Sequence, residues 1–291
     1  NGTTNFGTLT SVPGTPTKLA FTTQPTDTVY GSNISTVVVK TQDQFDNNSV
    51  PTSGANNVTI TLNSGTGAIA GTLVLDIGST GIASFSSILA NQAGTGNVLR
   101  AVATGLTSAD SSSFVINKAT PTAVLVVTNP SVAYNTLAQS AIVGTTSSSV
   151  PGSIANISTG GAADQTTAGT YAVTADFVPT DTTNYNTITA QSAGNFVINK
   201  ATPVITWANP SGIVYGTALS ATQLNASTPV AGSFVYTPAV GTLLNAGNGQ
   251  TLSTDFTPTD TTNYNSVNGT TATIMELHRK QTFVVYAALL L

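Results

Sequence analysis

The sequence of 291 residues contains no cysteine and very little charge. Without cysteine the chain can form neither disulfides nor thiolate metal sites. Charged residues make up 6% of the chain, against about 25% in an average soluble protein. The seven Lys and Arg residues are scattered along the chain, whereas a nucleic-acid surface needs clustered cations. We therefore expect no nucleic-acid partner.

Long apolar runs are also missing. No stretch reaches the roughly 20 apolar residues of a transmembrane helix, so we expect no transmembrane segment. The chain opens at Asn1 without a signal peptide, and we take it to be a mature or excised fragment. Because Lys and Arg are rare, trypsin-like proteases find few sites, which suits an extracellular or cell-surface location.

The residues of common catalytic sites are scarce. His278 is the only histidine and Glu276 the only glutamate. No Gly-x-Ser-x-Gly string is present for a serine nucleophile. The aspartates lie mostly in turn sequences, where a carboxylate caps backbone N–H groups. We expect the protein not to be an enzyme and to need no cofactor.

What the chain does contain favours β-structure. Thr stands beside Val and Ile throughout, and branched side chains suit a pleated, half-buried surface. Apolar residues show no helical period, and 26 Gly and 13 Pro interrupt the chain every few residues. Short alternating runs separated by turns are typical of β-sandwiches. The predicted fold class is all-β.

Two eight-residue strings occur twice. Phe114–Pro121 returns as Phe196–Pro203, and Pro179–Asn186 returns as Pro258–Asn265. The period of about 80 residues is too long for a solenoid and fits a small complete β domain. We predict three tandem domains at 1–118, 119–200 and 201–291, the last with an atypical tail at 275–291.

The predicted domains are joined by short linkers. Asn-Lys-Ala-Thr-Pro leads from the last strand of one domain to the first strand of the next, ending at Pro121 and at Pro203. Proline fixes φ and belongs at a strand start or edge. Linkers this short, without a Gly/Ser run, predict an elongated rod.

The repeated Asp-Thr-Thr-Asn-Tyr string predicts a structural site. Asp181 and Tyr185 recur as Asp260 and Tyr264, each after a Phe-x-Pro strand end. In immunoglobulin sandwiches a tyrosine near the start of the penultimate strand donates its hydroxyl to backbone upstream, the tyrosine corner. We predict this role for Tyr185 and Tyr264.

The same strings resemble a known family. The second and third domains resemble bacterial immunoglobulin-like repeats of the MBG type, and the first resembles a related bacterial Ig-like subtype. The resemblance rests on Ile198–Pro210, Val214–Ser220 and Phe256–Asn265, and in the first domain on Leu19–Pro25, Val37–Asp43 and Gly81–Phe85. It implies Ig-like sandwiches in large surface or secreted proteins, often adhesins, and brings no catalytic residues.

Two further groups have a functional and a structural interpretation. Asp43, Asp46 and Asn48 offer oxygen ligands for Ca²⁺, but no EF-hand spacing is present and such clusters usually form turns. Trp207 can stack on a sugar, or can be partly buried or contact a junction. We favour the structural interpretation in both cases.

The C-terminal tail departs from the repeat. Met275–Arg279 holds the only Met, Glu and His of the chain, and the strand-like run 282–291 follows. We expect 282–291 to close the third domain as its last strand. The alternative is insertion into a neighbouring molecule as a donated strand.

The sequence leaves three functions open. The first is a non-catalytic stalk segment whose partners are neighbouring Ig-like repeats. The second is a filament subunit that binds identical subunits by exchanging or donating strands. The third and weakest is a module that binds a host or cell-surface protein or glycan.

Overall fold

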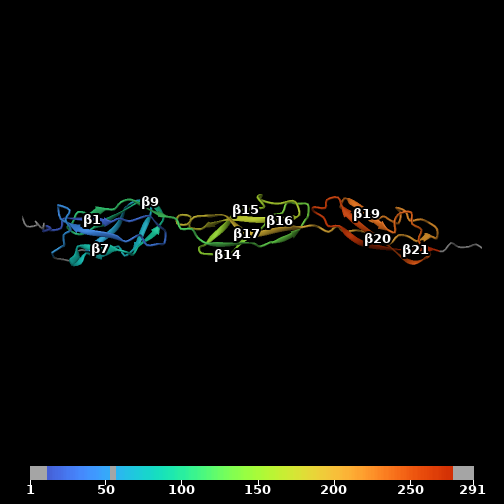
Figure 1. Ribbon diagram of the computed structural model, residues 1–291, viewed down its shortest axis with the longest axis horizontal. Coiled ribbons are helices and arrows are strands. Elements are labelled where there is room, and N and C mark those ends of the chain that lie inside the picture. The colour runs from blue at the N-terminus through green and yellow to red at the C-terminus, as the bar shows by residue number, and fades with distance from the viewer. Residues whose placement is uncertain (1–11, 53–56, 278–291) are drawn as a thin grey trace, which may run out of the picture. The chain divides into compact units, whose positions relative to one another are not determined.

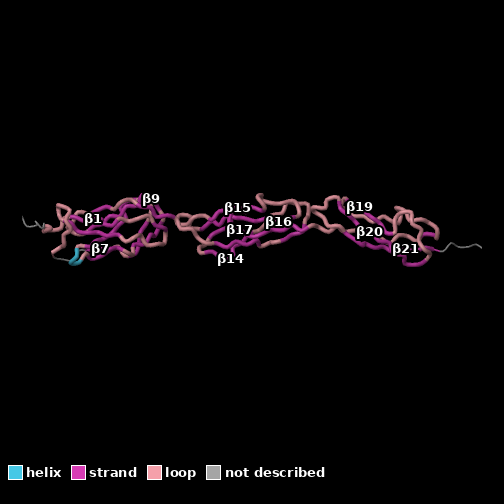
Figure 2. Tube along the Cα trace, viewed as in Figure 1, coloured by secondary structure: helices cyan, strands magenta, loops and turns pink. Residues whose placement is uncertain are grey.

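A computed structural model describes residues 12–52 and 57–277. In this part of the chain, the only helix is the single 3₁₀ turn η1, Gly78–Thr80, and the remaining regular structure is β (Figures 1 and 2). The all-β prediction is confirmed. Among the described residues, no helix has the length and apolar character needed to span a membrane.

The chain divides into two compact units. Unit 1 holds residues 1–124, 145–155 and 176–191, and unit 2 holds 125–144, 156–175 and 192–291. The predicted boundaries at 118 and 200 remain a prediction. The strands themselves form three successive groups, which we name the first, middle and third sandwich.

The first sandwich lies in unit 1 and contains eleven strands. They are β1 (Lys18–Thr23), β2 (Thr28–Val29), β3 (Val37–Gln42), β4 (Asn57–Ser64), β5 (Ala68–Gly71), β6 (Val74–Asp76), β7 (Ile82–Phe85), β8 (Ile88–Gln92), β9 (Gly94–Val102), β10 (Ala109–Asp110) and β11 (Phe114–Asn117). One sheet has the order β1-β3-β7. The other has the order β2-β11-β9-β4-β6, with β10 also paired to β9, while β5 and β8 form a separate pair.

The core of the first sandwich follows from alternation along its strands. Val37 and Val39 of β3 are fully buried, and so are Val58 and Ile60 of β4. Both pairs belong to one cluster of buried residues. The two sheets therefore face each other across a shared apolar layer, because residues two apart point to the same face.

The middle sandwich contains six strands. They are β12 (Ala123–Val127), β13 (Ser131–Ala133), β14 (Val143–Ser148), β15 (Gly152–Thr159), β16 (Gly169–Pro179) and β17 (Ile188–Asn199). β12 pairs with β14, and the other sheet has the order β13-β17-β16-β15. The buried residues Val173, Ala175 and Phe177 alternate along β16.

The third sandwich has one regular sheet. Its strands β18 (Ile213–Val214), β19 (Gly232–Thr237), β20 (Gly247–Pro258) and β21 (Val267–Leu277) have the order β18-β21-β20-β19. In this sheet β19, β20 and β21 correspond to strands C, F and G of an Ig-like sheet, because β20 lies between the other two. The segment after Pro203, expected as the first strand of the third domain, makes only an isolated bridge from Thr206 to Ser227 among the described residues. Before Ser227 the chain makes a turn in which the Ser220 carbonyl accepts the N–H of Leu224 at 3.0 Å.

A short parallel pair recurs in all three sandwiches. β2 runs parallel to β11, β13 to β17, and β18 to β21. Each short strand is followed directly by a tyrosine: Tyr30, Tyr134 or Tyr215. This pairing brings each tyrosine to the end of the last strand of its own sandwich.

Candidate functional site: the junction loops

The Asp-Thr-Thr-Asn-Tyr-Asn strings form two loops, which we name the junction loops. Loop 181–186 connects β16 to β17, and loop 260–265 connects β20 to β21. Tyr185 and Tyr264 therefore follow the penultimate strand instead of opening it. The predicted tyrosine corner is wrong for both residues, because the Phe-x-Pro string before them ends the penultimate strand itself.

The corner in the middle sandwich is made by Tyr171, which the sequence reasoning missed. Tyr171 lies near the start of β16, and its hydroxyl donates to the carbonyl of Thr167 at 2.8 Å. This is the position and the upstream bond expected of a tyrosine corner. The third sandwich has Gln250 three residues after the start of β20 instead. The signal missed in the sequence was a tyrosine two residues after the Gly that opens the strand.

Each junction loop is closed by its own aspartate. Asp181 Oδ1 accepts the N–H groups of Thr183 and Asn184, both at 3.1 Å, and its Oδ2 accepts the Asn184 side-chain amide at 2.8 Å. Asp260 makes the same three bonds within loop 260–265, at 3.1, 3.1 and 2.8 Å.

These hydrogen bonds lower the pKa of both carboxyl groups, the side-chain bond to the loop asparagine having the largest effect. They also fix the loop asparagines, because each side-chain amide is held by a carboxylate. Both carboxylates thus form these hydrogen bonds within their own loops.

The asparagine of each loop reaches back to an earlier strand group. Asn184 Oδ1 accepts the backbone N–H of Ala93, in the first sandwich, at 2.8 Å. Asn263 Oδ1 accepts the N–H of Ala168, in the middle sandwich, at 2.7 Å. Both alanines are followed by the glycine that opens a long strand, β9 or β16. One side chain per loop therefore links two successive sandwiches.

The tyrosine of each loop also packs on the preceding sandwich. The Tyr185 and Tyr30 rings meet edge to face, with centroids 5.4 Å apart and an interplanar angle of 83°. Tyr264 and Tyr134 repeat this arrangement at 5.3 Å and 85°. Partial burial raises the pKa of Tyr134, and Tyr264 and Asp260 raise it further. Such pairs stabilise by about 0.5–1.5 kcal/mol beyond their buried area.

The linker between the sandwiches is tied to the same loop. At the first junction Ala119 exchanges backbone hydrogen bonds with Asn184 and Asn186, at 2.8 and 2.9 Å. The Lys118 ammonium donates to the Thr182 carbonyl at 2.6 Å.

At the second junction Ala201 bonds Asn263 and Asn265, each at 2.9 Å, and Lys200 donates to Thr261 at 2.7 Å. Pro121 and Pro203 are both buried. All contacts of the first junction lie in unit 1, and all contacts of the second lie in unit 2.

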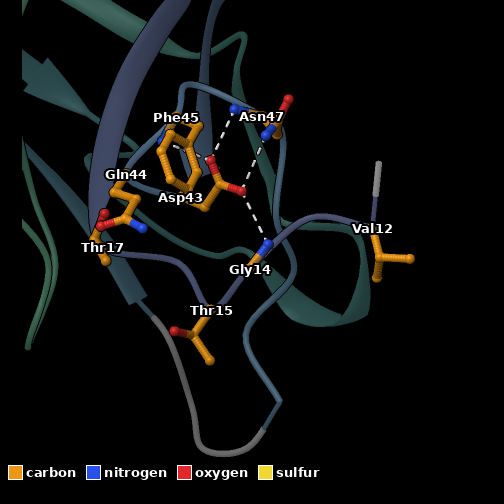
Figure 3. A pocket seen from close by; sticks show the side chains of 8 residues that line it. All are labelled: Val12, Gly14, Thr15, Thr17, Asp43, Gln44, Phe45 and Asn47. Atoms are coloured by element: carbon orange, nitrogen blue, oxygen red, sulfur yellow. Dashed lines mark hydrogen bonds between the residues drawn. The ribbon is translucent and has the colours of Figure 1, made fainter. Parts of the chain in front are cut away.

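The structure places the candidate calcium ligands in a capped turn. Asp43 accepts hydrogen bonds from the N–H groups of Gly14, Phe45 and Asn47 at 2.9–3.0 Å and from the Asn47 side chain at 3.1 Å (Figure 3). These bonds, that of Gly14 first, lower the pKa of Asp43 to about 2.

The other two candidates do not join Asp43 around a cation. Asp46 pairs with the Lys18 ammonium, and Asn48 is exposed. Within residues 12–52 and 57–277, no three His, Cys, Asp or Glu side chains gather where a metal ion could bind. The hydrogen bonds that Asp43 accepts cap the turn.

Trp207 is half-buried in the third sandwich. Its indole N–H donates to the Gln223 carbonyl at 3.1 Å, and its ring meets Tyr236 edge to face at 5.4 Å. The ring also packs against the buried cluster that contains Leu219 and Leu252. Trp207 is therefore partly buried, and its ring is not free to stack on a sugar.

The last described strand of the third sandwich is β21, which pairs with β20 on one side and β18 on the other and ends at Leu277. Residues 282–291, expected to close the third domain or to be donated, lie outside the described residues. His278 lies outside them as well.

Glu276 occupies the place of a core isoleucine. It pairs with the short parallel strand as Ile116 and Ile198 do in the other sandwiches. Its side chain is 1% exposed. Neither carboxylate oxygen has a hydrogen-bond partner among the described residues.

Comparisons with known proteins add little to this geometry. No protein-family model and no curated protein matches the chain, so the resemblance to MBG-type repeats remains a prediction. A solved structure of extracellular domains 3–5 of Drosophila OTK aligns with 92% of this chain and all of its own, at 10% identity and a TM-score of 0.25. A TM-score this low supports no relation in function.

Proposed function

We propose that the chain is a non-catalytic structural segment, a spacer of tandem Ig-like repeats in an extracellular or cell-surface protein. The observation that carries this proposal is the repeated junction. Two successive junctions use the same six-residue loop, the same linker string and the same pairs of partners. A ligand or catalytic site would not need to be built twice in this way.

The chemistry of the junction suits mechanical coupling. Every polar group of the loop aspartate and asparagine described above is bonded within the chain, so none is left to act on a substrate. The backbone, one amide side chain and one aromatic pair hold each linker. Coupling through several weak contacts keeps neighbouring repeats together without a disulfide.

The low charge of the chain and its family resemblance support an outer location. The resemblance to bacterial surface repeats suggests an adhesin-like stalk, in which such domains separate a binding module from an anchor. The partners would then be neighbouring Ig-like repeats.

Amide ¹⁵N relaxation of the full chain tests the spacer. We expect the first and middle sandwiches to share one rotational correlation time, because their junction restrains them. The double variant Asn184→Ala/Tyr185→Ala should give them separate correlation times while each keeps its own dispersed spectrum. Independent tumbling of the two sandwiches in the unchanged protein would contradict the proposal.

A second candidate, a subunit that assembles through strands, is favoured by one observation. In the described part of the chain, β19 lies at the edge of its sheet and pairs with β20 alone. Its Val235 side chain is 64% exposed, and the strand carries no Lys or other charge to block pairing. Sedimentation velocity separates the candidates: a monomer at all concentrations favours the spacer, and growth with concentration favours assembly.

A further inference from the structure

Both junctions use the same surface on the preceding sandwich. It consists of the tyrosine after the short parallel strand and an Ala-Gly pair at the start of a long strand. In the first sandwich these residues are Tyr30 and Ala93, and in the middle sandwich they are Tyr134 and Ala168. The tyrosine supplies its ring to the next loop, and the alanine supplies its backbone N–H.

The third sandwich carries the same surface. The Tyr215 N–H donates to the carbonyl of Leu277, the last residue of β21, at 2.9 Å. The equivalent bonds are Tyr30 to Asn117 at 2.9 Å and Tyr134 to Asn199 at 2.8 Å.

The alanine position is matched as well. Ala246 precedes Gly247, which opens β20 and pairs with Glu276 of the last strand. In the first sandwich Ala93 precedes Gly94, which pairs with Ile116 in the same way. The tyrosine turn also agrees, since Gly31 and Gly216 follow their tyrosines with φ of 82° and 85°.

The described chain leaves the third surface uncovered. The Tyr215 side chain is 57% exposed, whereas Tyr30 and Tyr134 are half-buried. The Ala246 N–H donates to no other residue in 12–52 or 57–277. The Tyr215 ring and the Ala246 N–H therefore have the same arrangement as the two groups that bind a junction loop on the first and middle sandwiches.

We propose that this end of the third sandwich, formed by Tyr215, Ala246 and Leu277, docks a junction loop from a repeat of a second polypeptide. The incoming asparagine would accept the Ala246 N–H, and the incoming tyrosine would pack edge-on against Tyr215. The partner is thus an Ig-like repeat that presents Asp-x-x-Asn-Tyr-Asn. The inference rests on the proposed function and names one partner for it.

The sequence after Leu277 disfavours the connection used at the two occupied junctions. There the last strand continues into Lys-Ala-Thr-Pro, which ties the linker to the loop. After Leu277 the chain reads His278-Arg279-Lys280-Gln281 instead. The loop at this end would therefore come from another polypeptide.

A second copy of this chain is also disfavoured. Its two junction loops are already seated on its own first and middle sandwiches. In its first sandwich the position of the loop tyrosine is taken by Thr107, which bridges to Lys18 as the later tyrosines bridge to alanine. The position of the loop asparagine is taken by Leu106. The partner is therefore a repeat whose loop is free.

The test uses the full chain with a second copy of residues 119–199 joined after Leu291. The tether raises the effective concentration of the free loop into the millimolar range, so that a weak contact is populated. We expect hydrogen exchange of the Ala246 amide to slow by about tenfold or more, as for a newly made hydrogen bond. The Ala168 amide, already covered, should not change.

Two matched controls decide the outcome. Asn184→Ala in the joined copy alone, and Tyr215→Ala in the main chain, should each restore the exchange rate of Ala246. The joined copy must show its own protected core amides; if it does not, residues 200–277 replace it.

Unchanged exchange of Ala246 beside a folded copy overturns the proposal, and so does protection that survives Asn184→Ala. Concentration-dependent protection in the unmodified chain would overturn the choice of partner in favour of a second copy. None of these results bears on the relaxation test of the spacer, which reads the first junction.

Discussion

At the scale of single residues, two tyrosines of the middle sandwich have different roles, and the role predicted for Tyr185 belongs to Tyr171. Tyr171 donates its hydroxyl to the Thr167 carbonyl, while Tyr185 uses its ring against Tyr30. No hydrogen bond of the Tyr185 hydroxyl to another described residue is found. The two hydroxyl groups should therefore differ in what they contribute to stability.

We expect Tyr171→Phe to destabilise the middle sandwich by about 1 kcal/mol, because a bond to backbone is lost. Tyr185→Phe should change stability little, since the ring contact is kept. Urea unfolding followed through amide signals of the middle sandwich measures both. Equal losses in the two variants would contradict the assignment of the corner to Tyr171.

Glu276 lies at the position that isoleucine occupies in the other two sandwiches. A buried carboxylate without hydrogen bonds loses its hydration and gains nothing in return. The third sandwich therefore contains an unsatisfied buried carboxyl group at a position where the other two have isoleucine.

We expect Glu276→Ile to stabilise the third sandwich by about 2 kcal/mol, because an unsatisfied buried polar group is removed. The reciprocal change, Ile198→Glu, should destabilise the middle sandwich by at least about 3 kcal/mol. Thermal unfolding of both variants measures the effects. A neutral or destabilising Glu276→Ile would show that the carboxylate is satisfied in solution.

Asp43 predicts a pH dependence for the first sandwich. Its pKa in the folded protein is about 2, below the ordinary value of 3.8. A depressed pKa gives stability that is present above the unfolded value and is lost as pH falls through the folded one.

We therefore expect stability to fall between about pH 4 and pH 2. Carbon-detected NMR titration of the Asp43 carboxyl should show a midpoint near 2, and Asp43→Asn should flatten the dependence of the first sandwich in this window. A midpoint at the ordinary value would mean that the four bonds do not form in solution.

At the scale of elements, the junction loop is a unit that the chain uses twice. Its aspartate shapes the loop, its asparagine and tyrosine reach the preceding sandwich, and the linker is bonded to its backbone. Because the contacts are divided among these residues, each should be removable without unfolding the sandwich that carries the loop.

We expect Asn184→Ala to speed hydrogen exchange of the Ala93 amide by about tenfold, because its only acceptor among the described residues is lost. Asn263→Ala should do the same for Ala168 and leave Ala93 unchanged. Exchange followed by NMR on the full chain measures both amides. An unchanged rate at both would show that the junctions open freely.

At the scale of the whole molecule, hydrogen bonds hold three aspartates of the described chain. Asp43, Asp181 and Asp260 are each bonded to three or more donors. A cation would have to displace these donors before it could bind.

We expect a chelator or millimolar Ca²⁺ to leave the unfolding temperature of the full chain unchanged. A ligand that binds only the folded state would raise that temperature. Scanning calorimetry with and without each addition measures this. If Ca²⁺ raises the unfolding temperature and Asp43→Asn abolishes this increase, Asp43 is a calcium ligand.

The sequence by itself determined the fold class and the repeat. Alternating Val, Ile and Thr fix β-structure locally, since residues two apart share a face, and copied strings of eight residues mark copied elements. Turn chemistry was also local: an aspartate bonding N–H groups two and three residues ahead can be expected from sequence spacing.

Only the tertiary structure decided what the copied residues touch. Tyr185 meets Tyr30, and Asn184 meets Ala93, across large separations in the chain, and no local pattern encodes such partners. Sequence spacing likewise could not show whether Tyr185 opens or follows a strand, and the corner was assigned to the wrong tyrosine. Glu276 appeared as part of an odd tail, and only strand pairing revealed that it stands in an isoleucine's place, because burial is set by the register of β21 against its neighbours.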